Sequence, residues 1–332
     1  MTGKRVAETT QKTVRTWIRG LLCALLALVT VTGAAHAEVY IDQEKPEDWE
    51  ERDLLRIWAL YALDCDSFVV ECGGQTMLID GGNKPKEADL VAFLAEHGWT
   101  HLDIIFNSHP HDDHIEAVYN ALMNDEITAE IFMSPFQEDY KANDKLEFHR
   151  KTLKVLEEKG IPFHQMLNNE ILKLGEAEVT LYRYDKTTKK PGGGSMTLND
   201  LSGVLRICYG ESSILLTADI GGTIQQMLAK DYGAEGGLKS DILKAPHHGK
   251  NAVNGDLLRA VEPKLVIVTG KVSRTETVVN QMKKNGIAWK RTSYGTILME
   301  TDGKDWYVTQ EDKFGELEKM RKQQEKNQKK KK

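Results

Sequence analysis

The chain has 332 residues, of which 40% are hydrophobic and 28% are charged, and its formal net charge is −6. The first 37 residues carry a net +4 and the last twenty carry +6, so residues 38–312 carry −16. An acidic body repels polyanions on average, which argues against a broad nucleic-acid groove, although bound metal ions would reverse the field locally. No Pro/Gly/Ser-rich linker and no internal repeat divides residues 38–312, so we expect one domain with a large core.

The N-terminus has the order of a secretory signal peptide. Five basic residues up to Arg19 precede an apolar run from Leu21 to Val29, and Ala35-His36-Ala37 then fits a small-x-small cleavage site. The apolar run is shorter than the roughly 18–20 residues of a membrane-spanning helix. We therefore expect residues 1–37 to be removed near Ala37 and the protein to be secreted, extracellular or periplasmic; an uncleaved membrane anchor is the alternative.

The opposite end, residues 313–332, is a basic tail with almost no apolar side chains. Such a segment buries too little surface to order itself, so we expect disorder or a frayed helix. A solubilising role and contact with an anionic surface fit this composition equally well.

Three cysteines remain once the leader is removed: Cys65, Cys72 and Cys208. An odd number excludes a complete intramolecular disulfide framework, and their spacing does not match a zinc ribbon. We expect them to be buried as small apolar residues, with one disulfide optional.

The body alternates predicted strands and helices. In its first half the apolar patterns predict strands over 55–63, 67–72 and 76–80, a helix over 88–96, a strand over 102–107 and a helix over 115–122. In its second half they predict strands over 203–209 and 213–217, a helix over 223–230, and strands over 240–245 and 265–269. Strand hairpins followed by strand–helix units predict an α/β sandwich, in which two sheets pack face to face with helices outside.

A cluster of histidines follows the strand predicted over 102–107. Residues 109–114 read His-Pro-His-Asp-Asp-His and hold three of the ten histidines. His109 and His111 stand two apart at a strand end, so an extended backbone points both to the same side. Asp113 continues that spacing, and His114 opens the next helix. Imidazole and carboxylate together suit Zn²⁺ or a neighbouring divalent metal, so this cluster predicts a metal site rather than a solvated loop.

Two further groups stand at the ends of other predicted strands. Asp219 follows the buried strand over 213–217, where a charge needs a partner. His247 and His248 follow the strand over 240–245. Each group alone also fits a capping carboxylate or surface histidines. Together with the cluster at 109–114, they predict a site for two metal ions.

The pattern His109-x-His111-x-Asp113-His114 resembles the motif of the metallo-β-lactamase superfamily. The surrounding stretches resemble, more narrowly, the soluble hydrolase domain of the ComEC competence proteins and its stand-alone secreted relatives, over about residues 54 to 302. The stretches that carry this likeness are Asp66-Ser67, Leu78 to Gly82, Asn199 with Ser202 to Arg206, Leu215 to Asp219, and Leu243 to Gly249.

The resemblance implies an αββα sandwich with the site at one edge of the sheets. It implies two divalent ions, expected to be zinc, bridged by Asp219. The first ion would be held by His109, His111 and Asp219. The second would be held by Asp113, His114, Asp219 and one residue of the His247-His248 pair, for which we favour His248.

The remaining roles follow from the same resemblance. Asp113 and His247 are the candidate catalytic residues, with His247 facing the substrate. Asp80, Asn199 and Ser202 are expected to support the ligands, Asp80 by fixing a ligand imidazole through its other ring nitrogen.

The sequence departs from the wider superfamily at one ligand. Enzymes such as the β-lactamases and glyoxalases have another histidine between the first cluster and the bridging aspartate, where this chain has only His149 and His164. His149 falls on a helix that we expect to be exposed, and His164 comes too early in the element order, so both are expected to be structural. The expected position falls near Asn199–Ser202, which leaves the first ion short of a nitrogen ligand. Weak binding, an oxygen ligand or Mn²⁺ in place of Zn²⁺ would follow.

The sequence thus predicts a secreted metal-dependent hydrolase, a phosphodiesterase or nuclease-like enzyme that activates water between two metal ions. The resemblance makes nucleic acid a candidate substrate. One alternative is hydrolysis of a small ester, a choline phosphodiester or a lactone, which the acidic body favours. Another is a catalytically weak metal-binding protein of the same fold. An antibiotic-hydrolysing β-lactamase is the least favoured enzyme, and no stable protein partner is expected.

Overall fold

The computed structural model describes residues 37–136, 146–315, 319 and 322. The expected leader, apart from Ala37, and most of the expected tail lie outside the described residues. Of the helices in the described ranges, none combines the length and the apolarity needed to cross a bilayer.

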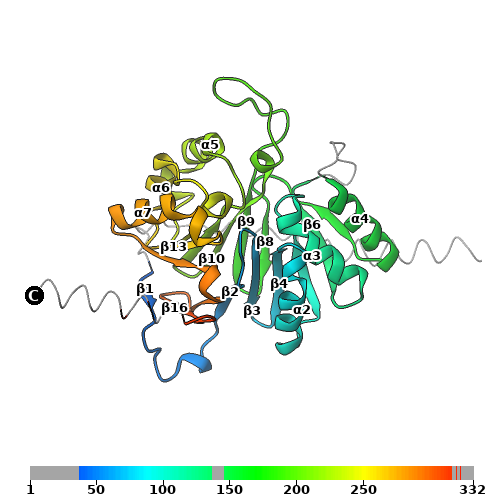
Figure 1. Ribbon diagram of the computed structural model, residues 1–332, viewed down its shortest axis with the longest axis horizontal. Helices are drawn as coiled ribbons and strands as arrows, with labels where there is room; N and C mark the ends of the chain where they lie inside the picture. Colours follow the sequence, from blue (N-terminus) through cyan, green and yellow to red (C-terminus); the bar gives the residue numbers. More distant parts are fainter. Residues whose placement is uncertain (1–36, 137–145, 316–318, 320–321, 323–332) are drawn as a thin grey trace, which may run out of the picture. The chain divides into compact units, whose positions relative to one another are not determined.

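Two β-sheets form the centre of the fold (Figure 1). Within the described residues, the first sheet has nine strands in the order β1-β16-β15-β2-β3-β4-β5-β6-β7, and the second has seven in the order β14-β13-β12-β11-β10-β9-β8. The strands of the first sheet are β1 Val39–Ile41, β2 Leu55–Ala59, β3 Ser67–Cys72, β4 Gln75–Gly81, β5 His101–Phe106, β6 Thr128–Ser134, β7 Phe163–Gln165, β15 Ile297–Thr301 and β16 Trp306–Gln310. Those of the second sheet are β8 Ile171–Leu174, β9 Ala177–Tyr182, β10 Val204–Tyr209, β11 Ser212–Leu216, β12 Ile242–Lys244, β13 Leu265–Val268 and β14 Ala288–Arg291.

Helices cover the outer face of each sheet, as Figure 1 shows. One apolar cluster joins the first sheet to its helices α2 Glu87–Glu96, α3 Asp112–Met123 and α4 Glu147–Lys159. A second joins the other sheet to its helices α5 Gly222–Tyr232, α6 Gly255–Val261 and α7 Glu276–Asn285. A third fills the space between the two sheets. These four layers confirm the predicted αββα sandwich.

The strands are apolar on both faces because both faces are covered. In β3, Phe68 and Val70 point into the space between the sheets, whereas Val69 points toward the helices. Such strands appear in the sequence as continuous apolar runs rather than as an alternation of apolar and polar residues. For this reason the continuous apolar runs in the sequence identified these segments as strands.

Parallel pairing in both sheets gives the fold an edge at which several loops meet. Strands β4, β5 and β6 run parallel in the first sheet, and β11, β12 and β13 run parallel in the second. The carboxyl ends of neighbouring parallel strands lie at the same edge of a sheet, where ligand sites of α/β proteins usually form. Asp80, the 109–114 cluster, Asp219 and the His247-His248 pair all stand at these carboxyl ends.

The first and the last described strands of the chain, β1 and β16, are neighbours in the first sheet. Strand β1 pairs in parallel with β16, in the register Val39 with Trp306. Next to this pair the Trp306 amide donates to the carbonyl of Glu38 at 2.7 Å, and the Glu38 amide donates to Asp305 Oδ1 at 2.9 Å.

Some boundaries and environments differ from the prediction. Strand β2 ends at Ala59 and not at residue 63, because Tyr61 turns to donate its amide to Thr296 Oγ1 and Asp64 has a left-handed φ of 61°. The helix expected to be exposed, α4, buries one face, and the prediction that His149 lies on an exposed helix is wrong, since only 1% of its surface is exposed.

The three cysteines in the described part of the chain, Cys65, Cys72 and Cys208, are free thiols, so the optional disulfide between them is not formed. Cys65 and Cys72 are buried as expected, whereas Cys208 is half-buried and its sulfur accepts a hydrogen bond from Arg206.

Candidate metal centre

Tight turns at the strand ends deliver the candidate ligands. Ala218, which precedes Asp219, has a φ of 45°, and His247 and His248 have φ values of 51° and 57°. Residues other than glycine seldom adopt this left-handed region, and where they do the surrounding structure must hold them there. Here the carbonyl of Ala218 accepts hydrogen bonds from the His247 amide at 3.0 Å and from Lys244 Nζ at 2.7 Å, which joins the two turns.

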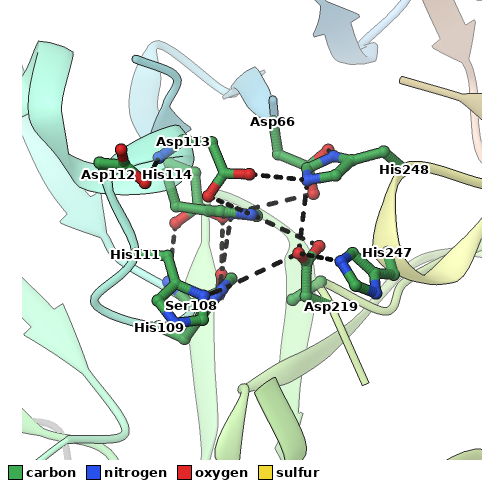
Figure 2. A network of polar contacts seen from close by, with 12 residues as sticks. Asp66, Ser108, His109, His111, Asp112, Asp113, His114, Asp219, His247 and His248 are labelled. Atoms are coloured by element: carbon green, nitrogen blue, oxygen red, sulfur yellow. Dashed lines mark hydrogen bonds and ion pairs between the residues drawn. The ribbon is translucent and has the colours of Figure 1, made fainter. Parts of the chain in front are cut away.

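The carboxylate of Asp219 lies at the centre of the cluster (Figure 2). Its Oδ2 is 3.3 Å from His248 Nε2, 3.7 Å from His247 Nε2 and 4.0 Å from His109 Nε2. Its Oδ1 is 3.4 Å from His114 Nε2. One carboxylate therefore faces imidazoles from both sheets, which is the arrangement that a bridging ligand needs.

Two imidazoles are oriented by a network around Asp80. His114 Nδ1 lies 2.7 Å from Asp80 Oδ2, which also accepts a hydrogen bond from Ser108 Oγ at 2.7 Å. The Ser108 oxygen in turn lies 3.1 Å from His109 Nδ1. With Nδ1 of both rings engaged, Nε2 of both is left to face Asp219. Carboxylates and hydroxyls that hold the far nitrogen of an imidazole in this way are typical of metal sites.

A third imidazole is oriented from the opposite side. His248 Nδ1 lies 3.1 Å from both Asp66 Oδ1 and Thr269 Oγ1, and Thr269 donates to the same Asp66 oxygen at 2.6 Å. His248 Nε2 then faces Asp113 Oδ2 at 3.3 Å as well as Asp219. The ring is fully buried, which leaves it one orientation.

The remaining members of the 109–114 cluster complete the inner surface. His111 Nδ1 lies 3.0 Å from His109 Nε2, so two imidazole nitrogens from neighbouring residues converge. Asp113 lies in the first turn of α3, and its Oδ1 is 3.8 Å from His114 Nε2. Helix α3 begins three residues earlier than expected, at Asp112, because acidic side chains are favourable at a helix N-terminus.

The donor set fits divalent metal ions. The Nε2 of His114 and the Oδ1 of Asp219 are both buried without a hydrogen-bond partner, although such atoms are costly to bury unpaired. A cation between them would pair both. Ligand atoms of Asp66, His114, Asp219 and His248 lie within 4.8 Å of one another, and so do those of His109, Asp113 and His114. Imidazole nitrogens and carboxylate oxygens at these spacings are the ligands that zinc and related metals take.

These groupings differ in part from the expected shells. Asp66 takes a place beside His114, Asp219 and His248, where the sequence predicted Asp113. Both Asp66 oxygens are already engaged, by Thr269 and His248 on one side and by Lys244 on the other. We therefore assign Asp66 to the orientation of His248 and not to the metal.

Burial and charge set the protonation of the cluster. Burial alone would lower the pKa values of His114 and His248, but the facing carboxylates, Asp219 foremost, raise both well above the ordinary value. For His109 and His247 burial prevails and lowers the pKa. Burial would raise the pKa of Asp219, but the imidazoles hold it well below its usual range. Because a ligand imidazole is neutral, a metal ion must displace protons from His114 and His248.

The cluster opens into a cavity of about 460 Å³. Its lining consists of His111, Asp112, Asp113, Glu147, Phe148, Asn199, Asp219 and His247. In Figure 2, His247 stands at the border of the cluster beside Asp219, opposite the 109–114 residues. About a third of its side chain is exposed, whereas His109, His114 and His248 are fully buried. His247 is thus accessible to a substrate in the cavity.

The region near Asn199–Ser202, where the expected histidine ligand is missing from the sequence, has two buried side-chain oxygens that face no partner. Asn199 lines the cavity at the start of a short 3-10 helix, Asn199–Leu201, and Ser202 follows it. Asn199 Oδ1 and Ser202 Oγ are both buried without a hydrogen-bond partner. The two other histidines are elsewhere: His149 is on the buried face of α4, and His164 Nε2 contacts Glu170 Oε1 at 2.5 Å.

Four residues of this centre had no role in the sequence prediction: Asp66, Ser108, Lys244 and Thr269. One of them carried a visible signal. Lys244 ends an otherwise apolar stretch of a central strand, and a charged residue at such a position requires a buried partner. Asp66 was visible only as part of a motif, since its partner His248 is 182 residues away in the sequence.

Comparison with known proteins gives one family and several solved structures. A family model described as the metallo-beta-lactamase superfamily matches residues 60–120. Among curated proteins no match was found. The metallo-beta-lactamase fold protein YhfI from Bacillus subtilis is 12% identical with a TM-score of 0.47, over 75% of this chain and 100% of that one.

Two further solved structures show a similar degree of likeness. A diphosphatase from the PhnP family is 15% identical with a TM-score of 0.45, over 75% of this chain and 98% of that one. CmlA, a diiron beta-hydroxylase from Streptomyces venezuelae, is 14% identical with a TM-score of 0.43, over 75% of this chain and 53% of that one. This chain thus spans about half of CmlA. Likenesses at these identities do not bear on activity.

Proposed function

We propose that the chain is a metal-dependent hydrolase of the metallo-β-lactamase superfamily, whose family model matches residues 60–120, and that it hydrolyses phosphodiesters with two divalent metal ions. One observation supports this proposal above all. Three buried imidazoles, each fixed through Nδ1, turn Nε2 toward a single buried carboxylate, Asp219, at the floor of an open cavity. A structural metal site is usually closed, whereas a catalytic one keeps an open side.

The proposed ligands keep the roles that the sequence suggested. His109, His111 and Asp219 would hold one ion, and Asp113, His114, Asp219 and His248 the other. When bound, two such ions activate water and offset the charge that develops on the attacking and leaving oxygens of a phosphodiester. Zinc suits the second set, and manganese is the candidate for the first, where Asn199 and Ser202 offer only oxygen atoms.

His247 is the proposed acid–base residue. Its Nε2 lies 3.7 Å from Asp219, and its lowered pKa, caused chiefly by burial, keeps the imidazole neutral at pH 7. A neutral imidazole accepts a proton at one nitrogen and donates at the other, so it is able to orient water or to protonate a leaving oxygen.

A choline-type phosphodiester is the second candidate substrate, and the lining of the cavity favours it. Asp112, Glu147 and Phe148 line the cavity. Carboxylates and an aromatic ring bind quaternary ammonium groups but repel a polyanion. The ammonium of Lys151 lies 5.2 Å from the centre of the Phe148 ring and pairs with Glu147, so both of these residues already contact a cation in the structure.

We propose in addition that the protein acts outside the cytoplasm after cleavage near Ala37. The support is the order of basic, apolar and small residues before Glu38. The basic tail is proposed to keep the protein soluble or to hold it on an anionic surface.

The test combines metal analysis with a substrate panel on one purified sample. The panel holds bis-p-nitrophenyl phosphate, single-stranded DNA, p-nitrophenyl phosphorylcholine, a lactone and a β-lactam. We expect turnover of the phosphodiesters, loss of turnover with a chelator, and recovery when Zn²⁺ or Mn²⁺ is returned. A preference for phosphorylcholine over DNA would select the second candidate. Full activity after chelation, with no metal left by elemental analysis, would refute the hydrolase proposal.

A further inference from the structure

Lys244 is a fully buried lysine at the floor of the metal centre. None of its surface is exposed, and it ends β12 three residues before His247. Lysine is almost never fully buried unless it is paired, since transfer of an ammonium group out of water is costly. The role of Lys244 therefore depends on the groups with which it pairs.

Those partners are the two carboxylates on either side of His248. Lys244 Nζ forms an ion pair with Asp66 Oδ2 and lies 3.7 Å from Asp219 Oδ1. It also donates to the carbonyl of Ala218 at 2.7 Å. One ammonium group thus contacts the carboxylate that orients His248, the proposed bridging ligand, and the backbone turn that precedes it.

Lys244 contacts two of the carboxylates that surround the centre. Those carboxylates are Asp66, Asp80, Asp113 and Asp219. The ammonium group contacts oxygen atoms only and occupies none of the proposed ligand positions. Metal binding therefore does not require Lys244 to leave its place beside Asp66 and Asp219.

We propose that Lys244 is a counter-ion built into the centre, which takes the place of part of the metal charge and keeps the metal-free protein folded. This inference rests on the proposed metal site. It makes the fold less dependent on metal than these four carboxylates alone would allow. It also weakens metal binding, because the ammonium repels an ion held by Asp219.

The experiment compares thermal unfolding of the full chain with chelator and with excess Zn²⁺. In Lys244→Met a hydrocarbon of similar length replaces the cation, which leaves Asp66 and Asp219 without it. Breaking a buried ion pair destabilises strongly, so the metal-free variant should lose more stability than the Zn²⁺-bound variant. We expect the rise in melting temperature on adding Zn²⁺ to be at least about 5 °C larger than in the unmodified protein. Zn²⁺ should also bind more tightly in competition with a chromophoric chelator.

Lys290→Met is the matched control. Lys290 is also a buried strand lysine, 7% exposed, and pairs with Asp42 at 3.1 Å, outside the metal centre. Its loss should lower both melting temperatures equally and leave the Zn²⁺-dependent rise unchanged. If Lys244→Met behaves like this control, or binds Zn²⁺ more weakly, Lys244 is a structural support and the inference is wrong. A flat response of the unmodified protein to Zn²⁺ would instead overturn the proposed metal site.

A second variant covers the case in which Lys244→Met does not fold. Asp66→Asn/Lys244→Met removes the carboxylate together with its cation. Removal of both charges is far less costly than leaving one buried alone. The double variant should therefore be soluble and more stable in chelator than Lys244→Met. Equal failure of the two variants would show that the charge balance is not what Lys244 provides.

Discussion

The carboxylate of Asp219 faces four imidazoles, so its removal should affect both metal positions. We predict that Asp219→Ala loses both ions and all measurable turnover. It should also lower the free energy of unfolding by about 1–3 kcal/mol, because buried ligand atoms lose their partner. Metal stoichiometry by elemental analysis, beside urea unfolding, checks this. Retention of two ions by Asp219→Ala would contradict the bridging assignment.

The histidines around Asp219 should separate into three classes. His109→Ala should remove mainly the first ion, which is short of a nitrogen ligand and is expected to be held loosely. It should also remove most of the turnover rate, since one ion alone cannot contact both the attacking and the leaving oxygen of the phosphodiester. His248→Ala should weaken binding of the second ion, which is expected to be held tightly by Asp113, His114, Asp219 and His248. His247→Ala should keep the metal content and slow turnover by about 10²–10⁴-fold, as expected for loss of an acid–base group. Metal content and rate are measured for each variant. Equal loss of the same ion in His109→Ala and His248→Ala would refute the division into two sites.

The raised pKa values of His114 and His248 predict how stability changes with pH. In the metal-free protein both imidazoles bind protons more tightly than in the unfolded chain, where the pKa is about 6.5. Their contribution to stability is fully present below that pH and is lost as the pH rises through the raised values. Melting temperatures measured in chelator should therefore fall above about pH 6.5. With Zn²⁺ bound the imidazoles are already neutral, so this fall should be absent. Parallel pH profiles in chelator and in Zn²⁺ would contradict the protonation assigned here.

For single residues of the metal centre, the sequence identified the candidate ligands but not the residues that orient them. His109, His111, Asp113 and His114 were visible because ligand-forming residues are close together in the sequence. Asp66 was not, because its role depends on contacts with His248 and with Thr269, 182 and 203 residues away. Hydrogen bonds between distant loops leave no local pattern in a chain.

Among the elements, those that carry the site residues could be predicted. The sequence patterns assigned no element to β6, β15, β16, α6 or α7, and they did not define the exact ends. Apolar runs such as Ser67–Cys72 mark strands covered on both faces, and the prediction of this strand is confirmed. The ends depend on single turn residues with unusual backbone angles, such as Asp64 with a φ of 61°. A side chain that tolerates a left-handed turn does not require one, so such ends become visible only in the folded chain.

One turn offers a test of how the elements hold the ligands. Gly249 has a φ of 80°, and a Cβ there would lie 2.9 Å from a methyl group of Val268 and 2.9 Å from one of Val278. We predict that Gly249→Ala costs about 2–4 kcal/mol, the sum of left-handed strain and overpacking, and weakens the tight metal site by displacing His248. Urea unfolding and Zn²⁺ titration measure the two effects.

Gly286 supplies the matched control for this turn. It ends α7 with a φ of 69°, and a Cβ there would meet nothing within 4 Å. Gly286→Ala should cost only about 1–2 kcal/mol of left-handed strain and leave Zn²⁺ binding unchanged. If Gly249→Ala costs no more than Gly286→Ala, the close packing behind His248 does not fix the ligand.

At the level of the whole molecule, the net charge distinguishes between a small phosphodiester and a long polyanion as substrate, whereas the fold does not. The body from residue 38 to 312 carries −16, and the lining of the cavity among the described residues contains no lysine or arginine. Only bound metal ions would attract a phosphodiester there. A small substrate that places one phosphate at the ions meets less repulsion than a long polyanion does.

The pairing of β1 with β16 has a consequence for the time course of folding. Glu38 and Asp305, which hydrogen bond beside this pair, are 267 residues apart in the chain. Contacts of such long range require closure of a very large loop, and proteins rich in them fold slowly. The edge of the nine-stranded sheet stays incomplete until Trp306 has left the ribosome. If the chain is exported as proposed, β1 stays unpaired during translocation until β16 arrives. Chaperones that shield exposed strands would act during that interval.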